Sequence, residues 1–419
     1  MSDWHKFELD QFADVLDNLR IPVNEEERTR SPGNTPYYGA NGLQGYINGW
    51  LFDEPLILIA EDGGYFDEYS TRPVAYKIEG KSWVNNHAHI LRPKESFDFD
   101  YVFYSLQHKN ITPFIKGGTR AKLNQKELRE IEIYAPKQKF DQCQISEILS
   151  TTDQTIEKTE ALIEKYQQIK AGLMHDLFTR GIGADGKLRP PREQAPELYQ
   201  QTPIGWIPKE WGLSKLKDFL VDNPTNGIYK SADQIGDGTL MIGQTAFTKE
   251  RSIDFALCRR GVISENEKKQ YAVSENNILI TRVFATVDGV GLPTLVPHMH
   301  ERAVFESNMM RLRVDDEKIS PLILFERLRN SKVRKLIVAG ANASNQVSIN
   351  QKTLNALPVP LVGGDEQSKI VNKINSYNRK YSIEKMNLTK LKQQKSGLMH
   401  DLLTGKVQVN TDHPEATHA

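Results

Sequence analysis

The chain of 419 residues is 38% hydrophobic and 26% charged, a composition typical of a globular protein with several domains. Its 54 basic residues are balanced by 54 acidic ones, so any nucleic-acid-binding surface has to be local. Two cysteines without close spacing exclude a disulfide framework and a cysteine-based zinc site. No apolar run approaches the roughly 20 residues that span a bilayer and no secretory signal opens the chain, which predicts a cytoplasmic protein with no membrane contact.

The two halves of the sequence resemble each other. The strongest match sets Lys170–Thr179 against Lys395–Thr404, and weaker matches follow the same order along both halves. These weaker pairs are Leu123–Leu128 with Ile349–Leu354, and Thr35–Gly39 with Thr239–Gly243. Ordered matches indicate a tandem duplication whose second half is about 20 residues longer in its middle.

Each half begins with short apolar runs among Gly, Pro and Asn, such as residues 56–59 and 277–281, and ends in a long helical pattern. We therefore expect an α+β fold with two similar β-rich globular domains and two long helices. In chain order the predicted parts are a first domain (1–140), a first helix (141–180), an exposed linker (181–203), a second domain (204–362), a second helix (363–404) and a flexible tail (405–419).

Both predicted helices carry a stripe of apolar residues at alternating steps of four and three, the heptad pattern of a coiled coil. The two stripes are related by the same shift as the sequence repeat, which favours pairing of the helices with each other. The alternative is two unrelated helices, each packed on its own domain. The apolar stripe positions are Ile145, Leu149, Ile156, Ile163, Tyr166, Leu173, Leu177, Ile370, Ile374, Tyr377, Tyr381, Leu388, Leu391, Leu398 and Leu402.

Basic and amide residues gather at equivalent places near the end of each predicted domain. Lys and Arg neutralise phosphates, while Asn, Gln and Arg can contact base edges in the major groove. Solvated helix faces are the alternative interpretation, but the repetition favours two DNA-binding surfaces. The candidates are Lys116, Thr119, Arg120 and Lys122 in the first half and Arg329, Lys332, Arg334, Lys335, Asn342, Asn345 and Gln346 in the second, completed by Tyr37, Tyr38, Asn41, Lys230 and Arg282.

Catalytic patterns are incomplete. Residues 181–188 approach a phosphate-binding loop, but Leu188 stands where a Ser or Thr would hold magnesium. The pairs at 87 and 89 and at 298 and 300 place two imidazoles on one strand face without an evident third ligand. We expect no catalytic residue, no metal site and no cofactor in this chain.

The order of domains and helices, the repeated Lys-x-Gly-Leu-Met-His-Asp-Leu motif and the Pro-x-Gly-Trp-x-Pro-x-x-Trp motif at 203–211 resemble the specificity subunit of type I restriction-modification systems. The resemblance implies two target-recognition domains that each read one half of a bipartite double-stranded DNA sequence. It also implies that the two helices pair antiparallel as a spacer.

The same resemblance implies partners. Two methyltransferase (modification) subunits would dock on the helices and use S-adenosylmethionine to methylate adenine. Restriction or motor subunits, joined through them, would use ATP and magnesium. A coiled-coil scaffold that binds proteins and reads no DNA remains the alternative function.

Overall fold

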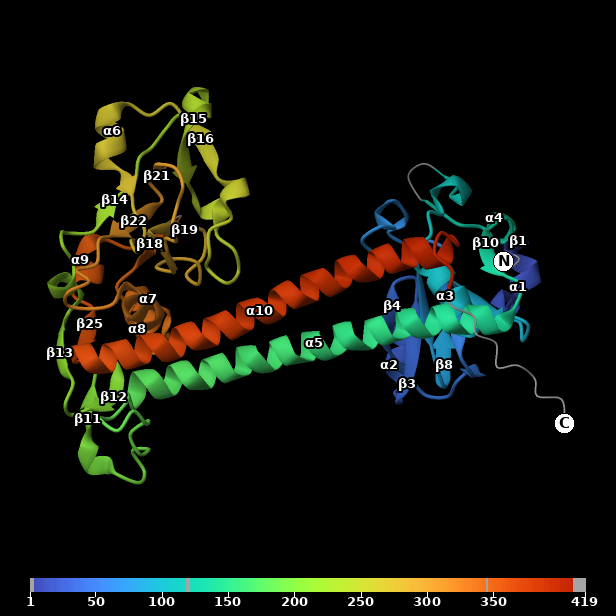
Figure 1. The fold of residues 1–419 in the computed structure, drawn as a ribbon, viewed down its shortest axis with the longest axis horizontal. Coiled ribbons are helices and arrows are strands. Elements are labelled where there is room, and N and C mark those ends of the chain that lie inside the picture. The colour runs from blue at the N-terminus through green and yellow to red at the C-terminus, as the bar shows by residue number, and fades with distance from the viewer. Residues whose placement is uncertain (1–3, 118–120, 344–345, 410–419) are drawn as a thin grey trace. The chain divides into compact units, whose positions relative to one another are not determined.

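The computed structural model describes residues 4–117, 121–343 and 346–409. The chain divides into two compact units, one formed by residues up to 163 together with those from 384 onward, the other by residues 164–383. Each unit contains one β-rich domain and the adjoining parts of two long helices (Figure 1). Within the described chain, no helix combines the length and the apolarity needed to cross a membrane.

Two four-stranded sheets form the first domain, and a strand pair closes it next to the long helix. Four short helices accompany them: α1 (Leu9–Phe12), α2 (Glu25–Arg30), α3 (Phe99–Gln107) and α4 (Gln125–Arg129). The first sheet has the order β2 (Ala13–Val15), β9 (Ala88–Pro93), β6 (Leu56–Ala60), β7 (Ala75–Ile78); the second β4 (Gly42–Ile47), β3 (Thr35–Gly39), β8 (Lys81–Val84), β5 (Phe52–Asp53); the pair is β1 (Trp4–Glu8) with β10 (Glu132–Pro136).

The second domain repeats this plan with the same strand orders. Its first sheet is β14 (Thr225–Asn226), β22 (Met309–Leu312), β18 (Ile278–Thr281), β20 (Pro293–Leu295), and its second is β16 (Arg259–Gly261), β15 (Ile235–Ile242), β21 (Ala303–Phe305), β17 (Ala272–Val273). Smaller elements are β11 (Tyr199–Thr202) with β12 (Gly205–Pro208), β13 (Gly212–Lys215) with β25 (Pro358–Leu361), β19 (Val283–Phe284) with β24 (Val347–Ser348) and β23 (Asn342–Ala343), and the helices α6 (Glu265–Gln270), α7 (Pro321–Arg329), α8 (Ser331–Ala339) and α9 (Gln351–Asn355).

Strand register confirms the duplication. The second sheet of each domain contains one parallel strand pair, β3 with β8 in the first domain and β15 with β21 in the second. Tyr37 lies opposite Trp83 in the first pair, and Met241 lies opposite Val304 in the second. The first members of these pairs belong to the weakest of the sequence matches, so that match was correct. The added length of the second half lies partly between β15 and β16, which are joined by residues 243–258, whereas β3 and β4 are joined by a tight turn.

The long helices α5 (Lys139–Thr179) and α10 (Gly364–Leu403) pair antiparallel, as the resemblance implied. In the second unit the Tyr377 hydroxyl donates to the Tyr166 carbonyl at 2.6 Å. In the first unit Lys395 Nζ lies 2.7 Å from Asp153 Oδ1. Residue numbers fall along α5 while they rise along α10, which is the antiparallel arrangement.

None of the fifteen stripe residues is exposed, but the stripe has two kinds of neighbour. Near the ends of the helices it enters the domain cores: Leu177, Ile370 and Ile374 belong to the core of the second domain, and Ile145, Leu149 and Leu402 to that of the first. The heptad stripe therefore packs helix against helix and also joins each helix end to a domain, so the two interpretations of the sequence are combined.

Residues 181–203, predicted as an exposed linker, include a buried ionic contact. The Arg189 guanidinium, 10% exposed, lies 2.6 Å from Glu366 on α10. Glu366 also accepts hydrogen bonds from the Trp211 indole N–H and from the Ile182 amide. Burial raises the pKa of Glu366, but these bonds and the Arg189 charge outweigh it, so the pKa lies below its ordinary value. Composition alone did not indicate this anchoring.

Candidate nucleic-acid interface

Near the end of each domain, two backbone segments pair at equivalent places in the repeat. In the first domain Lys116 and Lys122 exchange both backbone hydrogen bonds, at 2.8 and 2.9 Å. In the second domain Asn342 pairs with Ser348, at the same place in the repeat. We call segments 116–117 and 121–122 together the first hairpin, and segments 342–343 and 346–348 together the second hairpin. Three predicted DNA-binding residues, Thr119, Arg120 and Asn345, lie outside the described residues.

Each hairpin docks on the end of a central strand through the same backbone bonds. The Leu123 amide donates to the Glu61 carbonyl at 2.8 Å, just after β6. The Ile349 amide donates to the Arg282 carbonyl at 3.0 Å, just after β18. Because each pair comes from corresponding positions, the duplication preserves the position of both hairpins relative to their own sheets.

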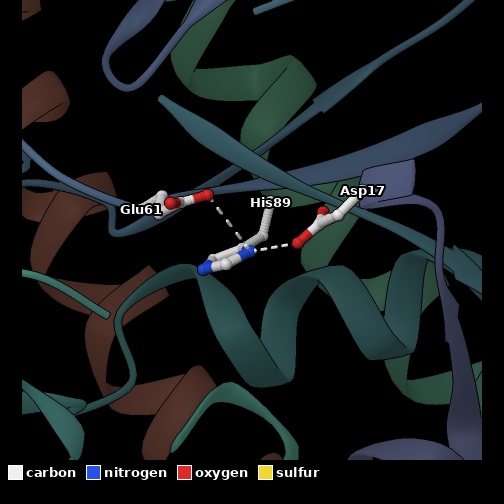
Figure 2. A group of neighbouring side chains, drawn as sticks. All are labelled: Asp17, Glu61 and His89. Carbon is white, nitrogen blue, oxygen red and sulfur yellow. Dashed lines mark hydrogen bonds and ion pairs between the residues drawn. The ribbon is translucent and has the colours of Figure 1, made fainter. Parts of the chain in front are cut away.

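A group of neighbouring charged side chains, Asp17, Glu61 and His89, contacts the residues at the end of the first hairpin; Figure 2 shows these three side chains. His89 on β9 is 1% exposed, and its Nδ1 lies 2.6 Å from Asp17 Oδ2. Its Nε2 lies 2.8 Å from the carbonyl oxygen of Leu123, the residue that follows the hairpin. Arg20 contacts Glu61 at 2.6 Å, and Glu61 also binds the Lys122 ammonium at 2.9 Å. We call Asp17, Arg20, Glu61, His89 and Lys122 the charged clamp.

Three members of the clamp, Asp17, Glu61 and His89, lie close enough together to be considered as metal ligands. Burial raises the pKa of both carboxyls, but His89 beside Asp17, and Lys122 and Arg20 beside Glu61, lower each pKa below its ordinary value. Both groups are thus carboxylates with cationic partners. The two nitrogens of His89 both face oxygen atoms, Asp17 Oδ2 and the Leu123 carbonyl, so both already have hydrogen-bond partners inside the protein.

Beside the second hairpin, the described residues include arginines that are not paired with carboxylates. Arg282 takes the place of Glu61, and its Nε donates to the Ser307 carbonyl at 3.0 Å. Arg334 on α8 donates to the Asp288 carbonyl at 3.2 Å, while its buried Nη1 has no hydrogen-bond partner within the described chain. These guanidiniums bind carbonyl groups rather than carboxylates, which leaves their charges available to an anion.

Arg251 belongs to the same surface, and the sequence analysis missed it. Its guanidinium donates to the carbonyls of Leu292 and Pro293 and to the Thr281 hydroxyl, next to Arg282. Burial, together with the charges of Arg329 and Arg334, lowers its pKa to about 10. Its φ of 65° is left-handed, which is uncommon for an arginine and often found at functional sites.

Arg251 lies in the connection between β15 and β16, which is much longer than the tight turn between β3 and β4 at the equivalent place in the first half. Because the first half has no equivalent of this longer segment, the sequence repeat gives no signal at Arg251. In the first domain the tight turn at this place carries Asn41, whose side-chain amide donates to the Gly63 carbonyl at 2.9 Å. Asn41 therefore also lies near the base of a hairpin.

The remaining predicted DNA-binding residues lie in varied surroundings. Lys332 and Lys335 are exposed on α8, with no ion-pair partner among residues that the structure describes. Asn342 and Gln346 are exposed on the second hairpin. Arg329 lies 3.3 Å from Glu326, and Lys230, whose side chain is 7% exposed, is paired with Glu267 at 2.9 Å.

Tyr37 and Tyr38 lie on β3 of the first domain. Tyr37 is 1% exposed, and its hydroxyl donates to the Val23 carbonyl. Tyr38 is partly buried beside Tyr76, with ring centroids 6.2 Å apart. Tyr37 thus supports the sheet and presents no ring face to a ligand in this conformation.

Comparison with known proteins agrees with this architecture. The profile of the type I restriction modification DNA specificity domain matches residues 1–168 and 208–393. The chain belongs to this family of specificity subunits. The family supplies DNA specificity rather than catalysis, so the expected lack of a catalytic role agrees with membership.

Individual relatives give the same result. A putative type I restriction enzyme specificity subunit of Haemophilus influenzae is 38% identical over 129 residues, which is 30% of this chain and 32% of that protein. The MjaVIII specificity subunit of Methanocaldococcus jannaschii is 24% identical over 74% of this chain and 70% of its own length. Thus the first relative is matched over about a third of its length.

Solved structures share the fold. A crystal structure of a type I restriction-modification S subunit from M. genitalium matches with a TM-score of 0.59 and 15% identity, covering 96% of each chain. A chain from a structural study of complex assembly and conformational transition of the type I system matches with a TM-score of 0.50 and 12% identity, covering 96% of this chain and 98% of that chain. At these identities the likeness concerns the fold alone.

Proposed function

We propose that each domain reads one half of a bipartite double-stranded DNA target, with its hairpin as the contacting segment. The observation that carries this proposal is the docking of two hairpins at equivalent strand ends, with Lys116 and Lys122 in the first hairpin and the cations of α8 and Arg282 beside the second. Hairpins fit the major groove, whose width admits a two-stranded ribbon. The work of such a protein is in the cytoplasm, where the DNA lies.

The second domain supplies most of the phosphate binding in this proposal. Arg251, Arg282 and Arg334 bind carbonyl groups, and the exposed Lys332 and Lys335 add two cations on α8. Lys and Arg at such a surface release counterions from the DNA, so the affinity falls steeply with salt. The exposed amides of Asn342 and Gln346 are the candidates for base contacts.

The paired helices are the proposed docking surface for two methyltransferase subunits. Gly172 and Gly397 occupy equivalent exposed positions inside the helices, and a Cβ at either would meet nothing within 4 Å. Glycine inside a helix costs about 1 kcal/mol relative to alanine, so an approaching partner backbone is a reason to keep it at both places. Like surfaces on the two halves suit two copies of one partner.

The cofactors belong to the partners in this proposal. The methyltransferase subunits would use S-adenosylmethionine to methylate adenine, and restriction or motor subunits, joined through them, would use ATP and magnesium. This chain would contribute the choice of sequence and the attachment of the partners.

A domain exchange tests the proposal. Residues 1–140 are replaced by the matching domain of a relative, and the methylated sites are mapped for the full complex. We expect one half-site to change and the other to remain, because each domain reads its own half-site. A change in both half-sites would contradict separate readout. Absence of salt-dependent DNA binding by the unaltered complex would favour the alternative, a scaffold that binds proteins only.

A further inference from the structure

We propose that the charged clamp, Asp17 with Arg20, Glu61, His89 and Lys122, positions the first hairpin for DNA readout, and that it works through hydrogen bonds and charge rather than through a metal ion. His89 is its central positioning residue. The inference rests on the proposed function of the hairpin as the DNA-contacting segment.

His89 joins the hairpin to the sheet from a buried position. Its Nε2 lies 2.8 Å from the Leu123 carbonyl oxygen, and its Nδ1 lies 2.6 Å from Asp17 Oδ2, both within hydrogen-bond distance. The other oxygen of Asp17 accepts the backbone amide of Ile90 at 3.0 Å, which holds the carboxylate in place on β9. The ring is therefore fixed at both nitrogens, and through it the end of the hairpin is fixed to the sheet.

Glu61 provides a second connection to the same hairpin strand. Its carboxylate binds the Lys122 ammonium at 2.9 Å, and its backbone carbonyl accepts the Leu123 amide at 2.8 Å. Arg20 holds this carboxylate from the opposite side at 2.6 Å and also donates to the Ala88 carbonyl at 2.9 Å. Lys122 and Leu123 are thus held by two side chains, those of Glu61 and His89, and Arg20 supports the first of these.

The second domain lacks this arrangement at the equivalent place. Ile59 lies opposite His89 in the pairing of β6 with β9, and Ile280 lies opposite Met310 in the pairing of β18 with β22. Met310 therefore replaces His89, and Arg282 replaces Glu61 at the residue whose carbonyl receives the hairpin amide. The backbone docking is common to both domains, while the charged clamp belongs to the first domain alone within the described chain.

The second domain also indicates which substitution to make. His89→Met copies its residue and removes the contacts of both ring nitrogens, but it leaves the buried Asp17 carboxylate with Arg20, 3.5 Å away, as its remaining cationic partner. The double variant D17N/H89M removes that buried charge as well. It should therefore destabilise the fold less, while the contact with Leu123 is still lost. Lys122→Met, at a half-exposed side chain, removes only the connection to Glu61. Met310→Leu is the matched control in the second domain.

Hydrogen exchange of the full chain without DNA tests the clamp directly. We expect the Lys122 and Leu123 amides to exchange at least tenfold faster in H89M, D17N/H89M and, by a smaller factor, K122M, while the Ser348 and Ile349 amides keep their rates. M310L should leave the first hairpin unchanged. Unchanged exchange at Lys122 and Leu123 in D17N/H89M and K122M would overturn the proposal.

A second measurement is the preference of the complex with its methyltransferase partner for each half-site of the DNA. A general loss of stability would not change this preference at one half-site alone. The D17N/H89M complex should lose about tenfold in preference for the first half-site and keep its preference for the second. Equal loss at both half-sites would mean a general effect and would count against positioning. Titration of the unaltered chain with Zn²⁺ alone would also overturn the proposal if it showed tight binding that H89M abolishes. If the unaltered complex discriminates neither half-site, the proposed function fails, and the exchange rates still decide about the clamp.

Discussion

The two hairpins are docked on their sheets by equivalent backbone hydrogen bonds, but the side chains beside them differ in charge. Beneath the first hairpin, the carboxylates Asp17 and Glu61 are matched by cationic partners. Beside the second, Arg251, Arg282 and Arg334 bind carbonyl groups instead. Backbone topology was therefore kept after the duplication while side chains diverged. A hairpin can be positioned either by internal ion pairs or on a cationic surface that also attracts DNA.

The largest expected effect comes from removing one member of the buried pair in the first domain. His89→Met removes the nearer partner of the Asp17 carboxylate and leaves Arg20 at 3.5 Å, which should lower the free energy of unfolding by about 2–3 kcal/mol. In D17N/H89M the combined loss should be smaller than the sum of the two single losses, because the residues interact directly. Urea unfolding of D17N, H89M and D17N/H89M measures these losses. Strictly additive losses would show that the two side chains are not coupled.

A substitution of Arg251 tests the cationic surface beside the second hairpin. Arg251→Asn removes the charge, while asparagine tolerates the left-handed φ. We expect about tenfold weaker DNA binding, from the loss of a charged hydrogen bond, and a salt slope smaller by about one. Arg313→Asn, which removes an exposed ion pair with Asp222, is the control and should bind like the unaltered chain. Unchanged affinity in Arg251→Asn would remove Arg251 from the interface.

Low pH should lower the stability of the first domain, because it protonates the carboxylates of the charged clamp. The pKa values of Asp17 and Glu61 lie below their ordinary values of 3.8 and 4.5. A carboxyl whose pKa is lower in the folded state adds stability that is fully present above the unfolded value and is lost as the pH falls through the folded value. Unfolding measured from pH 6 to pH 3 should show this loss below about pH 4.5. D17N/H89M should decline less over this range, and an equal decline would assign the acid sensitivity to other carboxyls.

The smallest expected effects concern the helices, where the two halves agree. Gly172→Ala and Gly397→Ala should each raise the free energy of unfolding of the isolated chain by about 0.5–1 kcal/mol, because alanine favours the helix. Both should weaken assembly with the methyltransferase subunits to a similar degree. Thermal unfolding and co-purification measure the two effects, and undiminished assembly would exclude these positions from the docking surface.

Sequence alone determined the duplication, the antiparallel helix pair by way of the family resemblance, and the equivalent location of the candidate segments near the end of each domain. These features depend on periodicity and on repeated local motifs, which a single sequence displays directly. Even the weak match of residues 35–39 with residues 239–243 agreed with the strand register.

Only the tertiary structure decided which of those side chains are available and which residues join them. Tyr37 and Lys230 are occupied inside the fold, while Arg251 reaches the hairpin base from a segment without a counterpart in the first half. The charged clamp combines residues 17, 61, 89 and 122, which are far apart in the sequence. Ion pairs of this kind depend on the meeting of separate strands, and no local pattern along the chain encodes that meeting.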